Sequence, residues 1–149
     1  MEVKKKIIVF LEALATLEDG IDLFLTCEHR YNKQSTEENE RWLKAARDSL
    51  IQRFEYCTDF FWKLIKLYLE DVGNMSFGLI SATGVLREAV KARLLSEEEG
   101  IQCMDMVESR NKTSHTYHEV MADEIAHEIP PYYELMEHIV ERMQSNIEK

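Results

Sequence analysis

Two long stretches of apolar residues at helical spacing constrain this chain more than any other feature of its sequence. In the first stretch, steps of four and three residues separate the apolar positions, which are Val3, Ile7, Phe10, Leu14, Leu17, Ile21 and Phe24. This spacing keeps one stripe of a helix apolar, as in helices that pack along their length at a shallow angle. Ile8, Leu11 and Leu25 widen the stripe. We therefore expect a long first helix that needs an equally long partner.

The second stretch supplies that partner, from about Glu38 to Asp71. Its apolar positions also keep helical spacing, and they are Trp42, Ala46, Leu50, Phe54, Cys57, Phe61, Leu64 and Tyr68. Phe60, Trp62 and Ile65 add apolar surface outside this stripe. A helix that is apolar on more than one side is either central in its domain or shared with a second subunit. The pattern predicts a two-fold homodimer that packs through its long helices.

Capping signals delimit the helices in the middle of the chain. Gly73 and Asn74 are expected to end the second helix, because both tolerate the left-handed conformation that follows many helices. Ser81 or Thr83 caps a short helix that follows. A capping box that starts at Ser96 opens a fourth helix. The sequence thus predicts short helices packed beside the long pair.

Few residues interrupt these helices. The chain of 149 residues has five glycines and two prolines, Pro130 and Pro131. A helix over about 119–128 is expected to end before the prolines, and Pro131 to begin a separate last helix, because proline is favoured at the first helical position. At this length the chain fits one domain, residues 1–149, with its own core. The prediction is an all-α, antiparallel four- to five-helix bundle.

Charge, cysteines and hydropathy limit what the protein binds and where it works. The formal net charge is −10, and an acidic surface repels phosphate backbones, which argues against a general nucleic-acid binder. A local basic pocket can still hold a single RNA strand.

Cys27, Cys57 and Cys103 lack metal-ligand spacing, so we interpret them as small buried hydrophobes in a reducing compartment. No apolar stretch approaches the roughly 20 residues that span a bilayer. A cytoplasmic protein without membrane contact is expected.

The densest polar cluster runs from Arg110 to Tyr117 and contains no aliphatic side chain. Arg110 is a fixed cation that can hold phosphate through two hydrogen bonds, and His115 is suited to proton transfer near neutral pH. The two residues reach one face only if the helix ends or bends between them. Together they can polarise a phosphodiester and move a proton from a ribose 2′-hydroxyl, with no metal or other cofactor. The alternative is a polar helix terminus, with Arg110 in a salt bridge.

The same region also raises the possibility of a metal site. His115 and His118 are three residues apart, and Glu119, Asp123 and His127 share one face if they are helical. Carboxylates beside histidines on an exposed helix usually form a solvated face. No metal site is therefore predicted.

Motifs over nearly the whole chain resemble those of a known family. In chain order they are Phe54-Glu55, Trp62-Lys63, Lys66-x-Tyr68-Leu69, Gly73, Val85-Leu86-Arg87-Glu88-Ala89, the run from Met106 to Tyr117, and Tyr132-Tyr133. The segment R-N-x-T-S-H-T-Y after an acidic and apolar helix is a specific signature. On these motifs the chain resembles the nucleotidyltransferase substrate-binding proteins of the HEPN superfamily.

The resemblance implies a dimeric helix bundle that works beside a separate minimal nucleotidyltransferase, usually encoded nearby. Many HEPN domains are metal-independent ribonucleases with the motif R-x4-6-H, which Arg110, Asn111 and His115 match. In such a site His115 would be the general base, Arg110 would stabilise charge on the phosphate, and Asn111 would orient one of them. In related toxin–antitoxin pairs the partner adenylylates the tyrosine of R-x4-H-x-Y and silences the toxin. Tyr117 occupies that position.

Two functions follow from the resemblance as expectations. The first is a ribonuclease toxin that takes RNA as substrate and is inhibited by its nucleotidyltransferase. The alternative is a non-catalytic subunit that presents substrate to that nucleotidyltransferase. The intact pair of Arg110 and His115 favours the first expectation, and the acidic surface favours the second.

Overall fold

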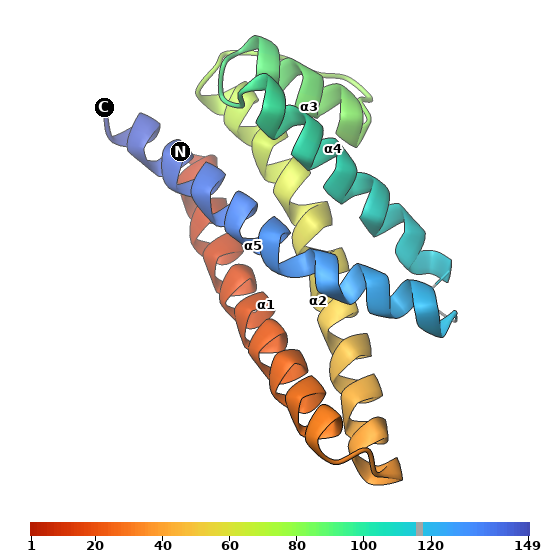
Figure 1. The fold of residues 1–149 in the computed structure, drawn as a ribbon. Coiled ribbons are helices and arrows are strands. Elements are labelled where there is room, and N and C mark those ends of the chain that lie inside the picture. The colour runs from red at the N-terminus through yellow and green to blue at the C-terminus, as the bar shows by residue number, and fades with distance from the viewer. Residues whose placement is uncertain (116–117) are drawn as a thin grey trace.

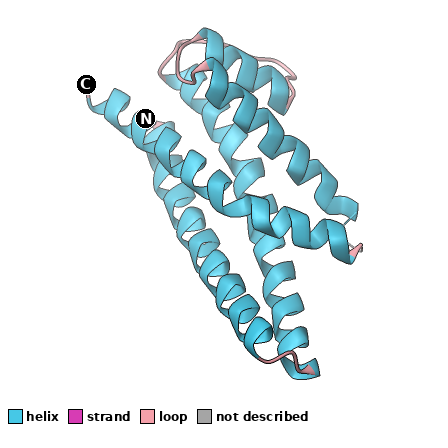
Figure 2. Ribbon diagram, in the orientation of Figure 1, coloured by secondary structure: helices cyan, strands magenta, loops and turns pink. Residues whose placement is uncertain are grey.

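The computed structural model describes residues 1–115 and 118–149. Within these residues there are five α-helices and one 3-10 turn, which are α1 (Glu2–Lys33), α2 (Glu37–Asp71), α3 (Ala82–Lys91), α4 (Glu97–Lys112), η1 (Thr113–His115) and α5 (Glu119–Glu148). The described residues contain no strand (Figure 2). The prediction of an all-α bundle is confirmed. In the same part of the chain, no helix combines the length and the apolar character that a bilayer crossing needs.

The two longest helices form the antiparallel hairpin that the sequence predicted. α1 and α2 run side by side for most of their length, and α5 crosses them both (Figure 1). All seven apolar positions of the first predicted stripe, from Val3 to Phe24, are buried. Thr36 caps the start of α2, because its hydroxyl accepts a hydrogen bond from the Asn39 amide at 3.1 Å. At the other end of α2, a Cβ on Gly73 would lie 2.7 Å from the Leu69 carbonyl, and Asn74 has a φ of 55°.

α2 is the central helix of the bundle. It contacts α1, α3, α4 and α5, and the short pair of α3 and α4 packs beside its C-terminal half (Figure 1). Ile65, which the sequence placed outside the buried stripe, is therefore completely buried, and Phe60 and Trp62 are half-buried. The wide apolar surface that suggested a dimer is thus covered to a large extent within one chain.

Three apolar positions assigned to the buried stripes are exposed instead. Trp42 is 57% exposed, and Ile8 and Leu25 also face solvent. Trp42 lies near the hairpin tip, and the ends of α1 and α2 there extend beyond the point where α5 crosses them (Figure 1). Helical spacing gives the direction of a side chain, but burial also needs another helix on that side.

The expected break at the proline pair is wrong, because Pro130 and Pro131 lie inside one continuous helix, α5. Each proline removes an N–H donor and crowds a carbonyl in the preceding turn, at a typical cost of about 3 kcal/mol in a helix interior. Buried residues anchor α5 on both sides of the pair, with Ala126 and Ile129 before it and Met136 and Ile139 after it. Burial of both halves offsets the local cost, so the helix continues.

The three cysteines are buried and unpaired, as predicted. Burial raises the pKa of Cys57 and of Cys103 to about 12. Both are therefore neutral thiols at physiological pH and serve as packing residues.

A charged link fastens the start of α4 to α5. Ser96 and Glu99 form the predicted capping box, in which the Glu99 amide donates to the Ser96 hydroxyl at 3.1 Å and the Ser96 amide donates to Glu99 Oε1 at 2.9 Å. Arg142 of α5 donates to both carboxylate oxygens of Glu99, at 2.7 and 2.9 Å. Chiefly through the hydrogen bonds from Arg142, the pKa of Glu99 falls to about 2.

We expect this link to make stability depend on pH in the acid range. Because the pKa of Glu99 falls from 4.5 to about 2 on folding, its contribution is complete above pH 4.5 and is lost as the pH falls towards 2. Urea unfolding of the wild type and of Glu99→Gln should differ by about 2 kcal/mol at pH 7 and converge near pH 2. A difference that stays constant from pH 7 to pH 2 would show that Glu99 has an ordinary pKa in the folded protein.

Candidate functional site

The predicted site residues lie where α4 ends. Arg110 and Asn111 belong to the last turn of α4, and His115 is the last residue of η1. The helix thus does end between Arg110 and His115, as the five-residue offset required. The Ser114 hydroxyl donates to the Asn111 carbonyl at 3.1 Å, a local bond that competes with continuation of the helix. The side chain of His115 and the whole of Tyr117 lie outside the described residues.

Two carboxylates of α2 hold the Arg110 side chain. Its Nε and Nη2 donate to the two oxygens of Asp59, each at 3.1 Å, and its Nη1 donates to Glu55 at 3.0 Å and to the Thr113 hydroxyl at 2.9 Å. The hydrogen bonds with Asp59, then the charges of Asp59 and Glu55, raise the pKa of Arg110 above its ordinary value. The salt bridge that the sequence left open as an alternative is therefore present.

The guanidinium of Arg110 is nonetheless available at one edge. The four bonds to Asp59, Glu55 and Thr113 use four of its five N–H groups, which leaves one on Nη2. The side chain is 26% exposed. A two-pronged bond to one carboxylate fixes the plane of a guanidinium. Arg110 thus offers a single oriented donor.

A pocket of about 290 Å³ lies beside Arg110, between α2, the start of α3 and the end of α4. Its wall consists of Thr58, Asp59, Trp62, Ser81, Ala82, Thr83, Val107, Arg110 and Asn111. Arg110 and Asn111 are the only members that sequence reasoning assigned to a site. The carboxylates of Glu55 and Asp59, one turn apart on α2, were a usable signal for a basic partner. No local pattern indicates the pocket, because three separate segments build it.

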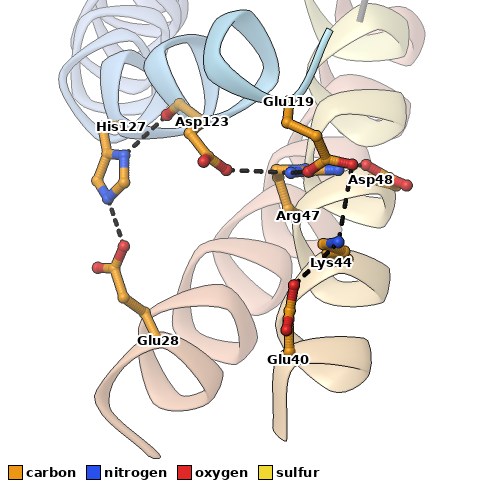
Figure 3. Close-up of polar contacts among 8 residues, drawn as sticks. All are labelled: Glu28, Glu40, Lys44, Arg47, Asp48, Glu119, Asp123 and His127. Atoms are coloured by element: carbon orange, nitrogen blue, oxygen red, sulfur yellow. Dashed lines mark hydrogen bonds and ion pairs between the residues drawn. The ribbon is translucent and has the colours of Figure 1, made fainter. Parts of the chain in front are cut away.

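A second polar cluster ties the start of α5 to α2. Arg47 is only 6% exposed and donates to Glu119 at 2.6 Å, to Asp123 at 3.1 Å and to Asp48 at 3.1 Å (Figure 3). Burial alone would lower the pKa of Arg47, but the hydrogen bonds with these carboxylates outweigh burial and raise it. α5 is therefore anchored immediately after residues 116–118.

This cluster contains three of the residues that suggested a metal site, Glu119, Asp123 and His127. Glu119 and Asp123 contact Arg47, and His127 lies 2.6 Å from a Glu28 oxygen on α1 (Figure 3). Among the side chains that the structure describes, which do not include that of His115, no group of three or more histidine, cysteine or carboxylate side chains is arranged to hold a metal ion. The role of Glu119, Asp123 and His127 is to join helices.

Comparisons with a family model and with solved structures both give matches. A family model described as "Nucleotidyltransferase substrate binding protein like" matches residues 5–145. Among solved structures, the crystal structure of a protein from Thermus thermophilus aligns with a TM-score of 0.71 and 33% sequence identity, over 90% of this chain and 98% of that chain. A search of curated proteins finds no significant match.

Proposed function

This chain belongs to the family of nucleotidyltransferase substrate-binding-like proteins, and from this membership we propose that it is the HEPN-type partner subunit of a minimal nucleotidyltransferase. The family match extends over residues 5–145, so the membership concerns nearly the whole chain and not one motif. We propose further that Arg110, Asn111 and His115 form a metal-independent endoribonuclease site, and that the chain acts as the toxin of a toxin–antitoxin pair.

The observation that carries the ribonuclease proposal is the orientation of Arg110. Its guanidinium is held by Asp59 and Glu55 at the rim of a pocket, with one N–H directed to no other described residue. A donor that is already oriented stabilises developing charge on a phosphate without reorganisation. In the proposed mechanism His115 takes the proton from the 2′-hydroxyl, whose oxygen attacks the adjacent phosphate. The bond to the 5′-oxygen of the next nucleotide breaks, a 2′,3′-cyclic phosphate forms, and the departing 5′-oxygen takes up a proton. Arg110 stabilises the charge on that phosphate.

The alternative, a non-catalytic binding subunit, is favoured by the charge of the same site. One cation, Arg110, lies against two carboxylates, Glu55 and Asp59, so the local charge is negative. A net negative charge weakens the binding of a phosphodiester, which the remaining N–H of Arg110 would have to hold directly. In a two-fold homodimer, which we also propose, the second Arg110 would face the same cleft and give the phosphate a second guanidinium donor.

Cleavage of single-stranded RNA by the purified chain tests the proposal. Cleavage should persist in EDTA and leave 2′,3′-cyclic phosphate ends, because the attacking oxygen is the neighbouring 2′-hydroxyl. Light scattering in the same buffer should give the mass of two chains. Cleavage that stops with the chelator would contradict the metal-independent mechanism. A folded dimer that cleaves no RNA would leave the binding subunit as the function.

Tyr117 is the expected point of control. With the partner nucleotidyltransferase, ATP and magnesium, we expect Tyr117 to gain an adenylate, whose phosphate would compete with RNA for Arg110. Intact-mass measurement should show the added adenylate, and peptide mapping should locate it. Tyr117→Phe should keep its melting temperature and its ribonuclease activity but resist inhibition. Adenylate found only on other residues would refute this role of Tyr117.

A further inference from the structure

We propose that the pocket between α2, α3 and α4 holds one nucleobase of a single-stranded RNA, adjacent to the Arg110 site. The choice of RNA rests on the proposed ribonuclease function, whereas the nucleobase itself is argued from the pocket. The pocket is about 290 Å³, near the lower end of the usual range for small-molecule sites of roughly 300–1,000 Å³. Such a space suits a single ring system and not a long ligand.

The first argument is a buried hydroxyl without a partner. Thr58 lines the pocket and is 0% exposed, and its Oγ1 has no hydrogen-bond partner among the residues that the structure describes. A threonine inside a helix commonly returns its hydroxyl to a carbonyl of the preceding turn. A buried polar group that makes no bond destabilises the fold, and native structures seldom retain one without a reason. A ligand with a polar edge would supply the missing partner.

The second argument is the mixture of an aromatic side chain and small polar groups in the lining. Trp62 is half-buried and forms part of the wall, and the hydroxyls of Ser81 and Thr83 lie 3.2 Å from each other at the start of α3. Asn111 of α4, whose side chain has an amide donor and a carbonyl acceptor, also lines the pocket. Nucleobases are flat rings with donors and acceptors along their edges, and proteins bind unpaired ones by stacking and edge hydrogen bonds.

The third argument is charge. Asp59 is in the pocket wall and Glu55 lies one turn away on α2, so two carboxylates face the single guanidinium of Arg110. A neutral base is compatible with these carboxylates, and one diester phosphate can take the remaining N–H of Arg110. A triphosphate carries several negative charges and would be repelled. The pocket therefore favours a base within an RNA strand over a free nucleoside triphosphate.

Binding can be measured through Trp62. The variant Trp42→Phe removes the other tryptophan, which is exposed and near the hairpin tip, so that all tryptophan fluorescence comes from Trp62. We expect at least one of adenosine, guanosine, cytidine and uridine to quench this fluorescence in a saturable way. Ribose 5-phosphate should not quench it. A short single-stranded RNA should bind at least as tightly as the best nucleoside, and the corresponding triphosphate about tenfold more weakly.

The nearly isosteric change Thr58→Val separates a ligand-binding role from a structural one. Because the hydroxyl is unpaired in the free protein, its removal should raise the melting temperature by about 2–4 °C. The same change should weaken nucleoside binding about tenfold, since the base loses its partner. Thr16→Val is the matched control, because the Thr16 hydroxyl of α1 bonds the Ala13 carbonyl at 2.7 Å. It should neither raise the melting temperature nor change the affinity.

Several results would overturn the inference. A lower melting temperature for Thr58→Val would mean that the hydroxyl has a partner in the fold. Absence of any nucleoside signal from Trp62, or a triphosphate that binds more tightly than its nucleoside, would contradict the assigned ligand. If nucleosides bind but RNA is not cleaved, the assignment of the pocket to a nucleobase is supported and the ribonuclease proposal fails. If RNA is cleaved while Trp62 gives no nucleoside signal, only the pocket assignment fails.

Discussion

Replacement of Arg110 by lysine should reduce RNA cleavage by about a hundredfold or more. Lysine keeps the positive charge but lacks the planar guanidinium group, whose Nε and Nη2 bond both oxygens of Asp59. Without that two-pronged bond, the remaining charge has no fixed direction towards a phosphate. The loss should appear in kcat, because the guanidinium is proposed to act on charge that develops in the transition state.

A matched change elsewhere on α2 controls for arginine loss in general. Arg53 is two residues from Glu55, but its side chain donates to the Thr16 carbonyl of α1 at 2.8 Å and makes no bond to Arg110, so Arg53→Lys should cleave RNA at the wild-type rate. Both variants should unfold cooperatively, since the partners of Arg110 are partly exposed and become hydrated when the arginine is removed. If Arg110→Lys cleaved RNA at the wild-type rate, the role of Arg110 would be limited to a structural ion pair.

Replacement of Arg47 by methionine should lower the free energy of unfolding by about 2–3 kcal/mol. The buried guanidinium bonds Glu119, Asp123 and Asp48 and so joins α2 to the start of α5. Methionine keeps most of the apolar packing of the arginine stem, so the change isolates the lost charge and hydrogen bonds. More than half of the Glu119 and Asp123 side chains is exposed, which limits the cost of leaving them unpaired.

The loss should be concentrated at the start of α5. Hydrogen exchange over residues 119–126 should accelerate in Arg47→Met, while exchange in the middle of α1 stays slow. Lys44→Met is the control, since Lys44 contacts Glu40 and Glu119 in the same cluster but is 46% exposed (Figure 3). It should leave the urea midpoint nearly unchanged, because water screens exposed ion pairs. Equal losses for the two variants in urea unfolding would show that burial of Arg47 is unimportant.

The sequence by itself determined most of the helices, because their signals are local. The seven-position stripe of α1 and the capping box of Ser96 and Glu99 each depend on residues a few positions apart. Hydrogen bonds of this kind form within one or two turns, so the order of residues is enough to predict them. The same local character made R-N-x-T-S-H-T-Y recognisable and placed Arg110 and Asn111 in one helical turn.

Only the tertiary structure decided which of these side chains are buried and which groups they meet. Arg110 bonds Asp59 and Glu55 from 51 and 55 positions away, and Arg47 bonds Glu119 from 72 positions away. The exposure of Trp42 and the continuation of α5 through its prolines likewise depend on where a neighbouring helix lies. Contacts of this kind arise when separate helices pack, and the packing minimises the free energy of the whole bundle and not of any one segment. A local pattern gives each helix its apolar side, but the charge and shape of the site come from the meeting of three helices.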